Sequence, residues 1–253
     1  MTFFRSLAPA LLAAAVATLP AAAASFTDGQ RGEIETIVKD YLLSHPEILE
    51  EVSAELSKRQ AAAEAEKHKA AVAKNADTLF NSPRGVLLGN RNGDVNFVEF
   101  FDYNCGYCKR AMGDMLELLK SDPKLRVTLK EFPVLGPNSV DAARVAVAVR
   151  MQDPSGRKYL DFHQKLLNTR GQADKAKALA AAKDAGLDMA RLEKDLATPE
   201  IDATLTENFK LAEDMGLNGT PSYVIGKEVL VGAVGIENLS KKISEARCGK
   251  AAC

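Results

Sequence analysis

The residues that build cofactor and metal sites are scarce in this chain. Its 253 residues include no tryptophan, three scattered histidines and four cysteines. No GxxxxGK(S/T), GxGxxG, HExxH or GxSxG motif occurs, so nothing indicates a phosphate-binding loop, a dinucleotide site, a zinc protease or a serine hydrolase. The net charge of −1 gives no electrostatic reason to expect nucleic acid or an anionic membrane surface as a partner. We therefore predict no cofactor, no bound metal and no nucleic-acid partner.

Residues 1–24 have the three parts of a secretory signal peptide. Arg5 provides a basic start, Leu7 to Leu19 is an apolar run, and Ala22 to Ala24 offers a small-residue cleavage site before Ser25. The run is short for a membrane span, and an uncleaved N-terminal anchor is the alternative. We predict cleavage and a periplasmic location, a compartment in which disulfides persist.

The segment that points to chemistry is Cys105-Gly106-Tyr107-Cys108. It follows an apolar segment with strand character, Val95 to Phe101, and precedes a helical pattern, Lys109 to Lys120. At such a junction the first thiol lies at a helix N-terminus, where unpaired N–H groups and the helix dipole favour an anion. The anion here is a thiolate, the reactive form of cysteine. The motif therefore predicts a thiol–disulfide exchange site.

Two other interpretations of the CxxC remain open. Half of a zinc site would need a second pair of ligands, but the other cysteines, Cys248 and Cys253, lie far along the chain with wider spacing. A structural disulfide in so short a loop would restrict the unfolded chain little. Cys248 and Cys253 could themselves form a local disulfide or an intermolecular one.

The segment after the signal peptide has a helical pattern with almost no strand signal. Pro46 separates two runs of apolar residues at three- and four-residue spacing, and from Ser57 to Lys74 the composition changes to alanine, lysine and glutamate. We predict that residues 25–79 form a helical oligomerisation arm, because an exposed apolar stripe must be buried somewhere. The alternative is that the stripe folds back on its own domain. The stripe consists of Ile34, Ile37, Val38, Tyr41, Leu42, Ile48, Leu49, Val52 and Leu56.

The remainder alternates between strand and helix signals. A helical stretch, Ser139 to Gly216, separates the early strands from a late hairpin, and a last helix covers Ile236 to Arg247. This order predicts an α+β fold with a helical insertion. The expected strands are Val86 to Leu88, Val95 to Phe101, Leu125 to Phe132, Ser222 to Ile225 and Val229 to Val231.

Three segments in this order resemble the DsbA-type thioredoxin fold: Phe100 to Cys108, Phe132 to Gly136 and Gly219 to Tyr223. The resemblance implies a thioredoxin-like domain formed by residues 80–137 and 217–253, interrupted by a helical domain at 138–216. The segment Tyr41 to Leu49 resembles the N-terminal segment of ScsC-like proteins, a DsbA-related group associated with copper tolerance.

The resemblance also implies roles for residues outside the CxxC. Pro221 would be the cis-proline that faces the two cysteines, with a trans turn as the alternative. Thr220, with Gly106 and Tyr107, would contact the substrate. Glu99 would be the buried acid that exchanges a proton with Cys108. Alternatively, Glu99 is a surface residue of its strand. Lys130 on the neighbouring strand is a possible partner for Glu99.

The predicted mechanism begins with attack of the Cys105 thiolate on a substrate sulfur and ends when Cys108 resolves the mixed disulfide. No histidine lies between the thiols, so we expect a less oxidising pair than in strong oxidants of the family. CGYC with threonine before the proline also resembles the bacterial isomerase DsbC. We predict a periplasmic protein disulfide oxidoreductase with isomerase activity. The alternatives are a DsbA-like dithiol oxidase and a Cu(I)-binding protein.

The predicted mechanism implies three kinds of partner. The clients would be secreted proteins that contain cysteine. A thiol reductant or oxidant in the membrane would set the redox state of the CxxC. A homo-oligomer, with a trimer favoured, would place several CxxC sites around one client.

Overall fold

The computed structural model describes residues 26–253, so the predicted signal peptide lies outside the described residues. The chain divides into two compact units, one ending at Ser57 and the other running from Lys58 to Cys253. The division falls inside α2 (Glu47–Lys74). Within residues 26–253, no helix is long and apolar enough to cross a membrane.

The first unit holds α1 (Asp28–Ser44) and the beginning of α2. Thr27 and Gln30 form a capping box at the start of α1, which satisfies N–H groups that the helix leaves unpaired. The helix ends before Pro46, as the sequence predicts. No residue of α1 is buried, and the apolar side chains of Ile37 and Val38 are 67% and 51% exposed. The apolar stripe is therefore without a partner inside this unit.

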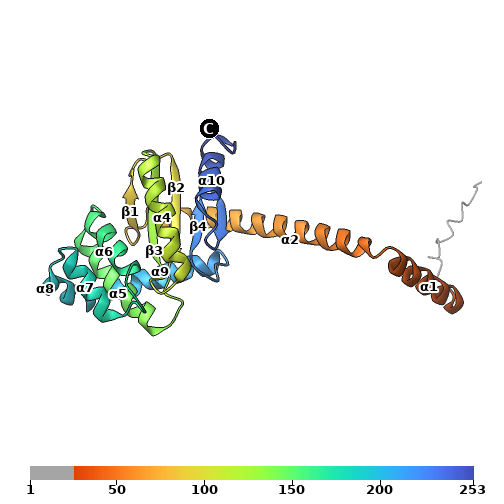
Figure 1. The fold of residues 1–253 in the computed structure, drawn as a ribbon, viewed down its shortest axis with the longest axis horizontal. Helices are drawn as coiled ribbons and strands as arrows, with labels where there is room; N and C mark the ends of the chain where they lie inside the picture. The colour runs from red at the N-terminus through yellow and green to blue at the C-terminus, as the bar shows by residue number, and fades with distance from the viewer. Residues whose placement is uncertain (1–25) are drawn as a thin grey trace, which may run out of the picture. The chain divides into compact units, whose positions relative to one another are not determined.

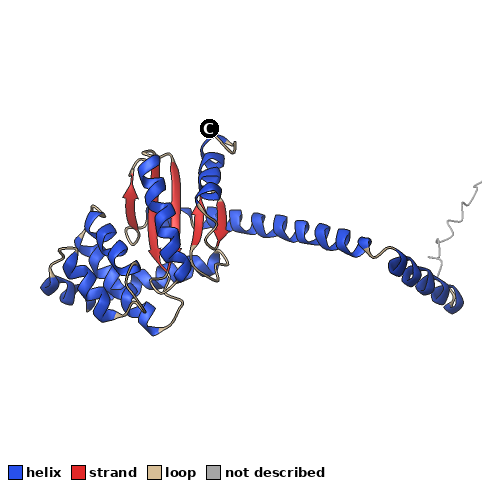
Figure 2. Ribbon diagram, in the orientation of Figure 1, coloured by secondary structure: helices blue, strands red, loops and turns tan. Residues whose placement is uncertain are grey.

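The second unit is built on a five-stranded sheet with the order β1-β3-β2-β4-β5 (Figure 2). β2 and β3 are parallel, and the other neighbouring strands are antiparallel. The two central strands are buried on both faces, which explains their nearly continuous apolar sequences. The strands are β1 (Val86–Gly89), β2 (Val95–Phe101), β3 (Leu125–Glu131), β4 (Ser222–Ile225) and β5 (Glu228–Val231).

Helices cover both faces of this sheet, and alternate residues of β2 contribute to two core clusters. Phe97 and Phe101 share a cluster with residues of α4 (Gly106–Ser121) and α10 (Ile236–Cys248). Val98 and Phe100 belong to a second cluster, with residues of α3 (Ala76–Asn81) and α9 (Pro199–Asp214). The strand period of two thus assigns each side chain to one layer. Figure 1 shows α4 running beside the central strands.

The insertion between β3 and β4 is helical, as predicted. Its helix α5 contacts α6, α7, α8 and α9, and Figure 1 shows α5 to α8 gathered beside the sheet. Most of the buried residues of α5 are alanine or valine, and small side chains allow several helices to pack closely around it. The first four helices are α5 (Pro137–Gln152), α6 (Arg157–Leu167), α7 (Lys175–Asp184) and α8 (Met189–Leu196).

The end of the predicted arm belongs to the second unit's core. Val72 near the end of α2 and Leu79 in α3 are buried in the cluster that contains Val98 and Phe100. The boundary that the sequence places after residue 79 stays a prediction, but these contacts show that the residues just before it support the sheet.

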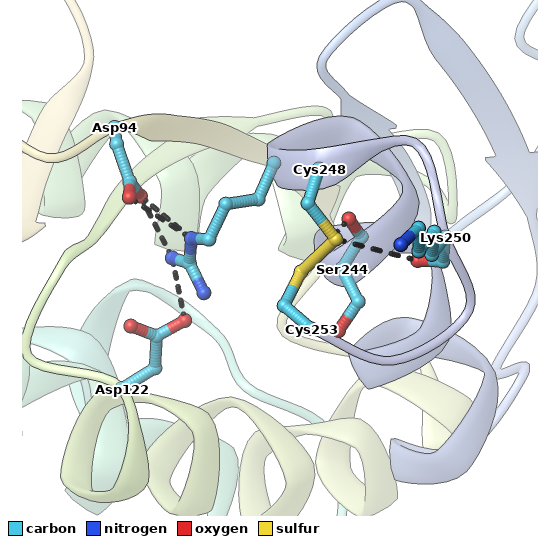
Figure 3. The surroundings of a disulfide bond; sticks show 7 residues. Asp94, Asp122, Ser244, Cys248, Lys250 and Cys253 are labelled. Atoms are coloured by element: carbon cyan, nitrogen blue, oxygen red, sulfur yellow. Dashed lines mark hydrogen bonds and ion pairs between the residues drawn. A yellow bond between two sulfur atoms is a disulfide. The ribbon is translucent and has the colours of Figure 1, made fainter.

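The C-terminal cysteines form a local disulfide, Cys248–Cys253, at the end of α10 (Figure 3). The preceding residue, Arg247, is hydrogen-bonded to Asp94 at 2.7 Å and to Asp122 at 2.8 Å. Asp94 precedes β2 and Asp122 follows α4, so Arg247 ties the last helix to both. Of the two alternatives for Cys248 and Cys253, a local or an intermolecular disulfide, the structure contains the local one.

The suggested pairing of Lys130 with Glu99 is wrong. The strand register places Lys130 beside Phe100 and Glu99 beside Leu129, so the two side chains leave opposite faces of the sheet. Lys130 is fully buried, and its Nζ lies 3.5 Å from Glu207 and 3.4 Å from Asn208 of α9. Burial lowers the pKa of Lys130, while Glu207 acts in the opposite direction.

The Lys130–Glu207 pair yields a prediction about stability. Glu207→Gln should destabilise the protein at the lower end of about 3–5 kcal/mol, because it leaves a buried ammonium without its carboxylate. Lys130→Met should cost less, since Glu207 keeps Arg84 as a partner at 3.0 Å. Urea unfolding of both variants at pH 7 measures the difference. If both variants lost the same free energy of unfolding, the Lys130–Glu207 charge pair would not determine the stability of this part of the core.

Candidate active site

The two cysteines of the CxxC lie where β2 gives way to α4. Cys105 is the N-cap residue of α4, and its backbone oxygen accepts the Lys109 N–H at 3.1 Å. Cys108 lies in the first turn. Both are free thiols and both are buried. The predicted position of Cys105 at a helix N-terminus is confirmed.

The segment around Pro221 meets Cys105 from the other half of the thioredoxin-like domain. The Thr220–Pro221 peptide bond is cis, which confirms the prediction made from the resemblance. As a neutral thiol, Cys105 donates a hydrogen bond from Sγ to the Thr220 carbonyl oxygen at 3.1 Å. Residues 115 positions apart in sequence therefore meet at the first sulfur.

The pKa values of the two thiols are displaced in opposite directions. The pKa of Cys105 is lowered to about 5, mainly by a hydrogen bond from Cys108. Hydrogen bonds from the Thr220 side chain and from the backbone N–H groups of Cys108 and Tyr107 lower it further, while burial opposes this. The pKa of Cys108 is raised, first by its hydrogen bond to Cys105 and then by burial. At neutral pH the pair thus consists of one thiolate and one thiol.

Glu99 lies on the same face of the sheet as the cysteines. It alternates with Phe97 and Phe101, which share a core cluster with Cys105 and Cys108. Its side chain is buried, so the alternative of a surface residue is wrong. Burial raises its pKa to about 8, and the charges of Asp114 and Cys105 act in the same direction. At pH 7 most molecules therefore carry a neutral carboxyl group here.

The two residues between the cysteines lie at the surface. Tyr107 is 58% exposed, and the Arg110 guanidinium lies over its ring at 4.4 Å from the centroid. Gly106 is also exposed, and a Cβ atom added to it would meet no atom within 4 Å. Both are accessible beside Cys105, and their contact with a substrate stays a prediction.

Two residues that the sequence analysis left without a role hold the turn before Cys105. Asp102 is buried and accepts hydrogen bonds from Asn104 N at 2.8 Å, Ser139 Oγ at 2.7 Å and Leu135 N at 2.9 Å. The Asn104 side chain bonds to both the N–H and the carbonyl oxygen of Ala173, at 2.7 and 3.0 Å. In the sequence, the only sign of this role is that Asp102 directly follows an apolar strand. The other hydrogen-bond partners of Asp102 and Asn104 lie 33 to 69 residues away, so no local pattern identifies them.

The insertion therefore holds the turn before Cys105 directly. Ser139 lies in the first turn of α5 and Ala173 precedes α7, and Lys109 of α4 donates to the Thr169 carbonyl oxygen at 3.2 Å. In residues 26–253, no three His, Cys, Asp or Glu side chains are arranged to hold a metal ion. Near neutral pH the buried side chains of this site are therefore a thiolate at Cys105, a thiol at Cys108 and a mostly neutral carboxyl group at Glu99.

Comparison with protein families finds two matches along the chain. Residues 97–244 match the DSBA-like thioredoxin domain. Residues 30–63 match the copper resistance protein ScsC N-terminal domain. The first match contains both cysteines and Pro221, and the second covers most of α1 and the beginning of α2.

The chain is 28% identical over 168 residues to the Na(+)/H(+) antiporter NhaA 1 of Salinispora arenicola. A similar antiporter of Salinispora tropica is 26% identical over 165 residues. The chain spans only about a quarter of the length of these curated relatives, since the alignment covers 66% of this chain but 25% of the first antiporter.

Solved structures resemble a much larger share of the chain. A thioredoxin-like oxidoreductase from Silicibacter pomeroyi is 42% identical, with a TM-score of 0.64 over 68% of this chain and 96% of that one. A variant of Proteus mirabilis ScsC is 30% identical, with a TM-score of 0.66 over 89% and 98%. BcfH of Salmonella enterica Typhimurium is 26% identical, with a TM-score of 0.75 over 87% and 96%. The chain belongs to the DsbA-like family of thioredoxin-fold proteins, with an ScsC-type N-terminal domain.

Proposed function

We propose that this protein is a periplasmic protein disulfide oxidoreductase with isomerase activity, acting through Cys105 and Cys108. The observation that carries the proposal is the opposite displacement of the two pKa values, with Cys105 near 5 and Cys108 raised. A low pKa provides the attacking thiolate at neutral pH, and a high pKa keeps the second thiol protonated until it is needed.

The exchange begins when the Cys105 thiolate attacks one sulfur of a client disulfide. A bond forms between Cys105 and the client, and the other client sulfur leaves as a thiolate. If that thiolate attacks another disulfide of the client, the client finally releases Cys105 with its bonds rearranged and no net redox change. Otherwise Cys108 loses its proton and attacks Cys105, which releases the client as a dithiol and leaves an enzyme disulfide.

Glu99 is the candidate acceptor for the proton that Cys108 must lose. Its ionised form raises the pKa of Cys108, which places the two groups close enough to interact. With a pKa of about 8, Glu99 exchanges protons readily near neutral pH. In the reverse direction its protonated form returns the proton to Cys108 as the enzyme disulfide is reduced.

The isomerase assignment rests on the apolar face of α1 and the beginning of α2. Ile37, Val38 and Leu49 are more than half exposed in the single chain, and burial between copies would remove this surface from water. Several CxxC sites in one oligomer, with a trimer favoured, raise the concentration of thiols around one client. The clients would be secreted proteins that contain cysteine. A membrane reductant would return the enzyme disulfide to the dithiol.

A second candidate function uses the same thiols to bind Cu(I). The match of residues 30–63 to a domain named for a copper resistance protein favours testing it, and soft thiolates suit this ion. Anaerobic Cu(I) titration of the mature protein, beside recovery of scrambled ribonuclease, separates the two. Stoichiometric tight binding without any recovery of ribonuclease activity would favour the copper function.

Thiolate absorbance should show Cys105 titrating near pH 5 in the reduced protein. Because this pKa lies below the usual thiol value of 9.0, the thiolate stabilises the folded reduced protein above pH 9. That contribution is lost as pH falls through 5. The stability of the reduced protein relative to the disulfide form should therefore rise between these two pH values. A midpoint at the ordinary cysteine value would remove the basis for the nucleophile assignment.

Substitution of each cysteine should have a different result. Cys105→Ser should abolish exchange. Cys108→Ser should accumulate mixed disulfides with clients, because the resolving thiol is absent. Non-reducing electrophoresis after incubation with a scrambled client distinguishes the two outcomes, and trapping by the Cys105→Ser variant would contradict the order of attack.

Glu99→Gln should slow exchange by up to about a hundredfold, as expected when a proton acceptor is lost. It should not reduce stability at high pH. The raised pKa means that the folded state resists ionisation of Glu99, so wild-type stability falls as pH rises from about 4.5 to about 8. Glutamine removes this fall. Rate–pH profiles and urea unfolding at pH 6 and 9 test both parts, and an unchanged rate profile would reject the proton-transfer role.

Deletion of residues 26–57 should convert an oligomer into a monomer and shift activity from isomerase towards oxidase. The deletion stops at Ser57 because Val72 packs in the second unit. Ile37→Glu should weaken the same assembly, whereas Asp40→Asn, at an exposed polar position of α1 outside the stripe, serves as the matched control. Sedimentation measures the oligomeric state, and scrambled-ribonuclease recovery measures the isomerase. A monomeric mature protein at working concentration would end the oligomer proposal.

A further inference from the structure

Four segments meet at Cys105 or at the turn before it, and none contains a carboxylate. One runs from this turn into α4, and another, before Pro221, places the Thr220 carbonyl oxygen 3.1 Å from the first sulfur. The other two bond to Asp102 and Asn104. Together they contain three basic residues. The four segments are residues 103–113, 132–140, 168–173 and 216–221, and their basic residues are Lys109, Arg110 and Arg170.

The two basic residues of α4 lack a carboxylate partner. The Arg110 guanidinium lies over the exposed ring of Tyr107, 4.4 Å from its centroid. Asp114 lies one turn further along α4, but its pKa is raised, mainly by burial, whereas a paired arginine would lower it. Lys109 Nζ donates to a neutral oxygen, the carbonyl oxygen of Thr169, at 3.2 Å. Among the described residues, neither cation therefore forms an ion pair.

The loop before α7, residues 168–173, brings a third cation to this surface. Lys177 Nζ donates to the carbonyl oxygens of Arg170 and Gln172 at 3.0 and 2.7 Å, which holds the loop in place. The Arg170 side chain is exposed, and it has no hydrogen bond or ion pair within the part of the chain that the structure describes. Asp174 follows the loop, but its carboxylate accepts the N–H of Lys177 at 2.9 Å. The charge of Arg170 is therefore available to a partner.

The charge on this surface is opposite in sign to that of the whole chain. Three basic residues and no acidic residue give the four segments a charge of +3, whereas the chain carries −1. Of the five carboxylates directly next to the segments, only that of Asp141 is exposed. A surplus of positive charge beside a nucleophile attracts anionic groups and speeds their encounter with it. The four carboxylates that are buried or partly buried are Asp102, Asp114, Glu131 and Asp174.

We propose that the surface around Cys105 selects clients whose reactive cysteine is flanked by aspartate or glutamate. The client carboxylates would contact Arg110 on one side of the nucleophile and Arg170 on the loop, while Lys109 adds charge between them. Guanidinium groups suit this role because their N–H donors match the geometry of a carboxylate. The preference rests on the proposed attack of Cys105 on client disulfides, and it specifies the class of client.

Two synthetic peptides test the preference. Each is closed by one disulfide, and the glutamates beside the cysteines of the first are glutamines in the second. The reduced mature protein converts the peptide disulfide into a dithiol while Cys105 and Cys108 become a disulfide. At low ionic strength the glutamate peptide should react about three- to tenfold faster, as expected of a few exposed ion pairs. The preference should disappear in 1 M sodium chloride, where the Debye length is about 3 Å.

The same two peptides with β-mercaptoethanol give the order of reactivity without the protein surface. There the glutamate peptide should react no faster, because its carboxylates repel a free thiolate. Equal rates for the two peptides with the wild-type protein would overturn the client preference and leave the proposed function standing. If neither peptide is reduced, the proposed function fails and the preference fails with it.

Substitutions connect the preference to this surface. Arg110→Gln and Arg170→Gln should each lower the ratio of the two rates, and the double variant should bring it close to the value with β-mercaptoethanol. The ratio is the relevant quantity, since a change in the reactivity of Cys105 affects both peptides alike. Lys120→Gln, at the exposed far end of α4, is the matched control and should keep the wild-type ratio. A wild-type ratio in the double variant would reject this surface.

Discussion

The parallel pairing of β2 with β3 is the constraint on which the rest of this structure depends. Both strands are buried on two faces, so each side chain is assigned to one layer by the strand period. A shift of one residue would exchange the layers. Glu99 would then leave the face that it shares with Cys105, and Lys130 would lose the carboxylate of Glu207. The same register thus supports the candidate site on one side and a buried ion pair on the other.

The pKa values of the two thiols are displaced in opposite directions because of where β2 ends and α4 begins. β2 delivers the chain to Cys105 at the N-terminus of α4, where backbone N–H groups are free to stabilise a thiolate. One turn further, Cys108 is enclosed by the core and donates a hydrogen bond to the first sulfur. The same short segment therefore favours a charge at one sulfur and opposes it at the other. The buried carboxyl group of Glu99, with its raised pKa, lies on the same face of the sheet as the two sulfurs.

The helical insertion does more than cover the sheet. Ser139 and Ala173 bond to Asp102 and Asn104, so the turn before Cys105 is held by two segments of the insertion. A short turn held only by its own backbone would be free to reorient. Polar contacts, as well as apolar packing, therefore determine how the insertion meets this part of the molecule.

The sequence alone determined the features that depend on neighbouring residues. Apolar runs indicated all five strands, Pro46 marked the break in the arm, and the position of the CxxC predicted a thiol at a helix N-terminus. The resemblance of three segments predicted the thioredoxin fold and the cis bond at Pro221. Only the tertiary structure showed that Lys130 faces away from Glu99 and that Asp102 and Asn104 hold the turn before Cys105. The physical reason is that these features depend on strand register and on contacts between residues 33 to 69 positions apart, which local pattern and propensity do not specify.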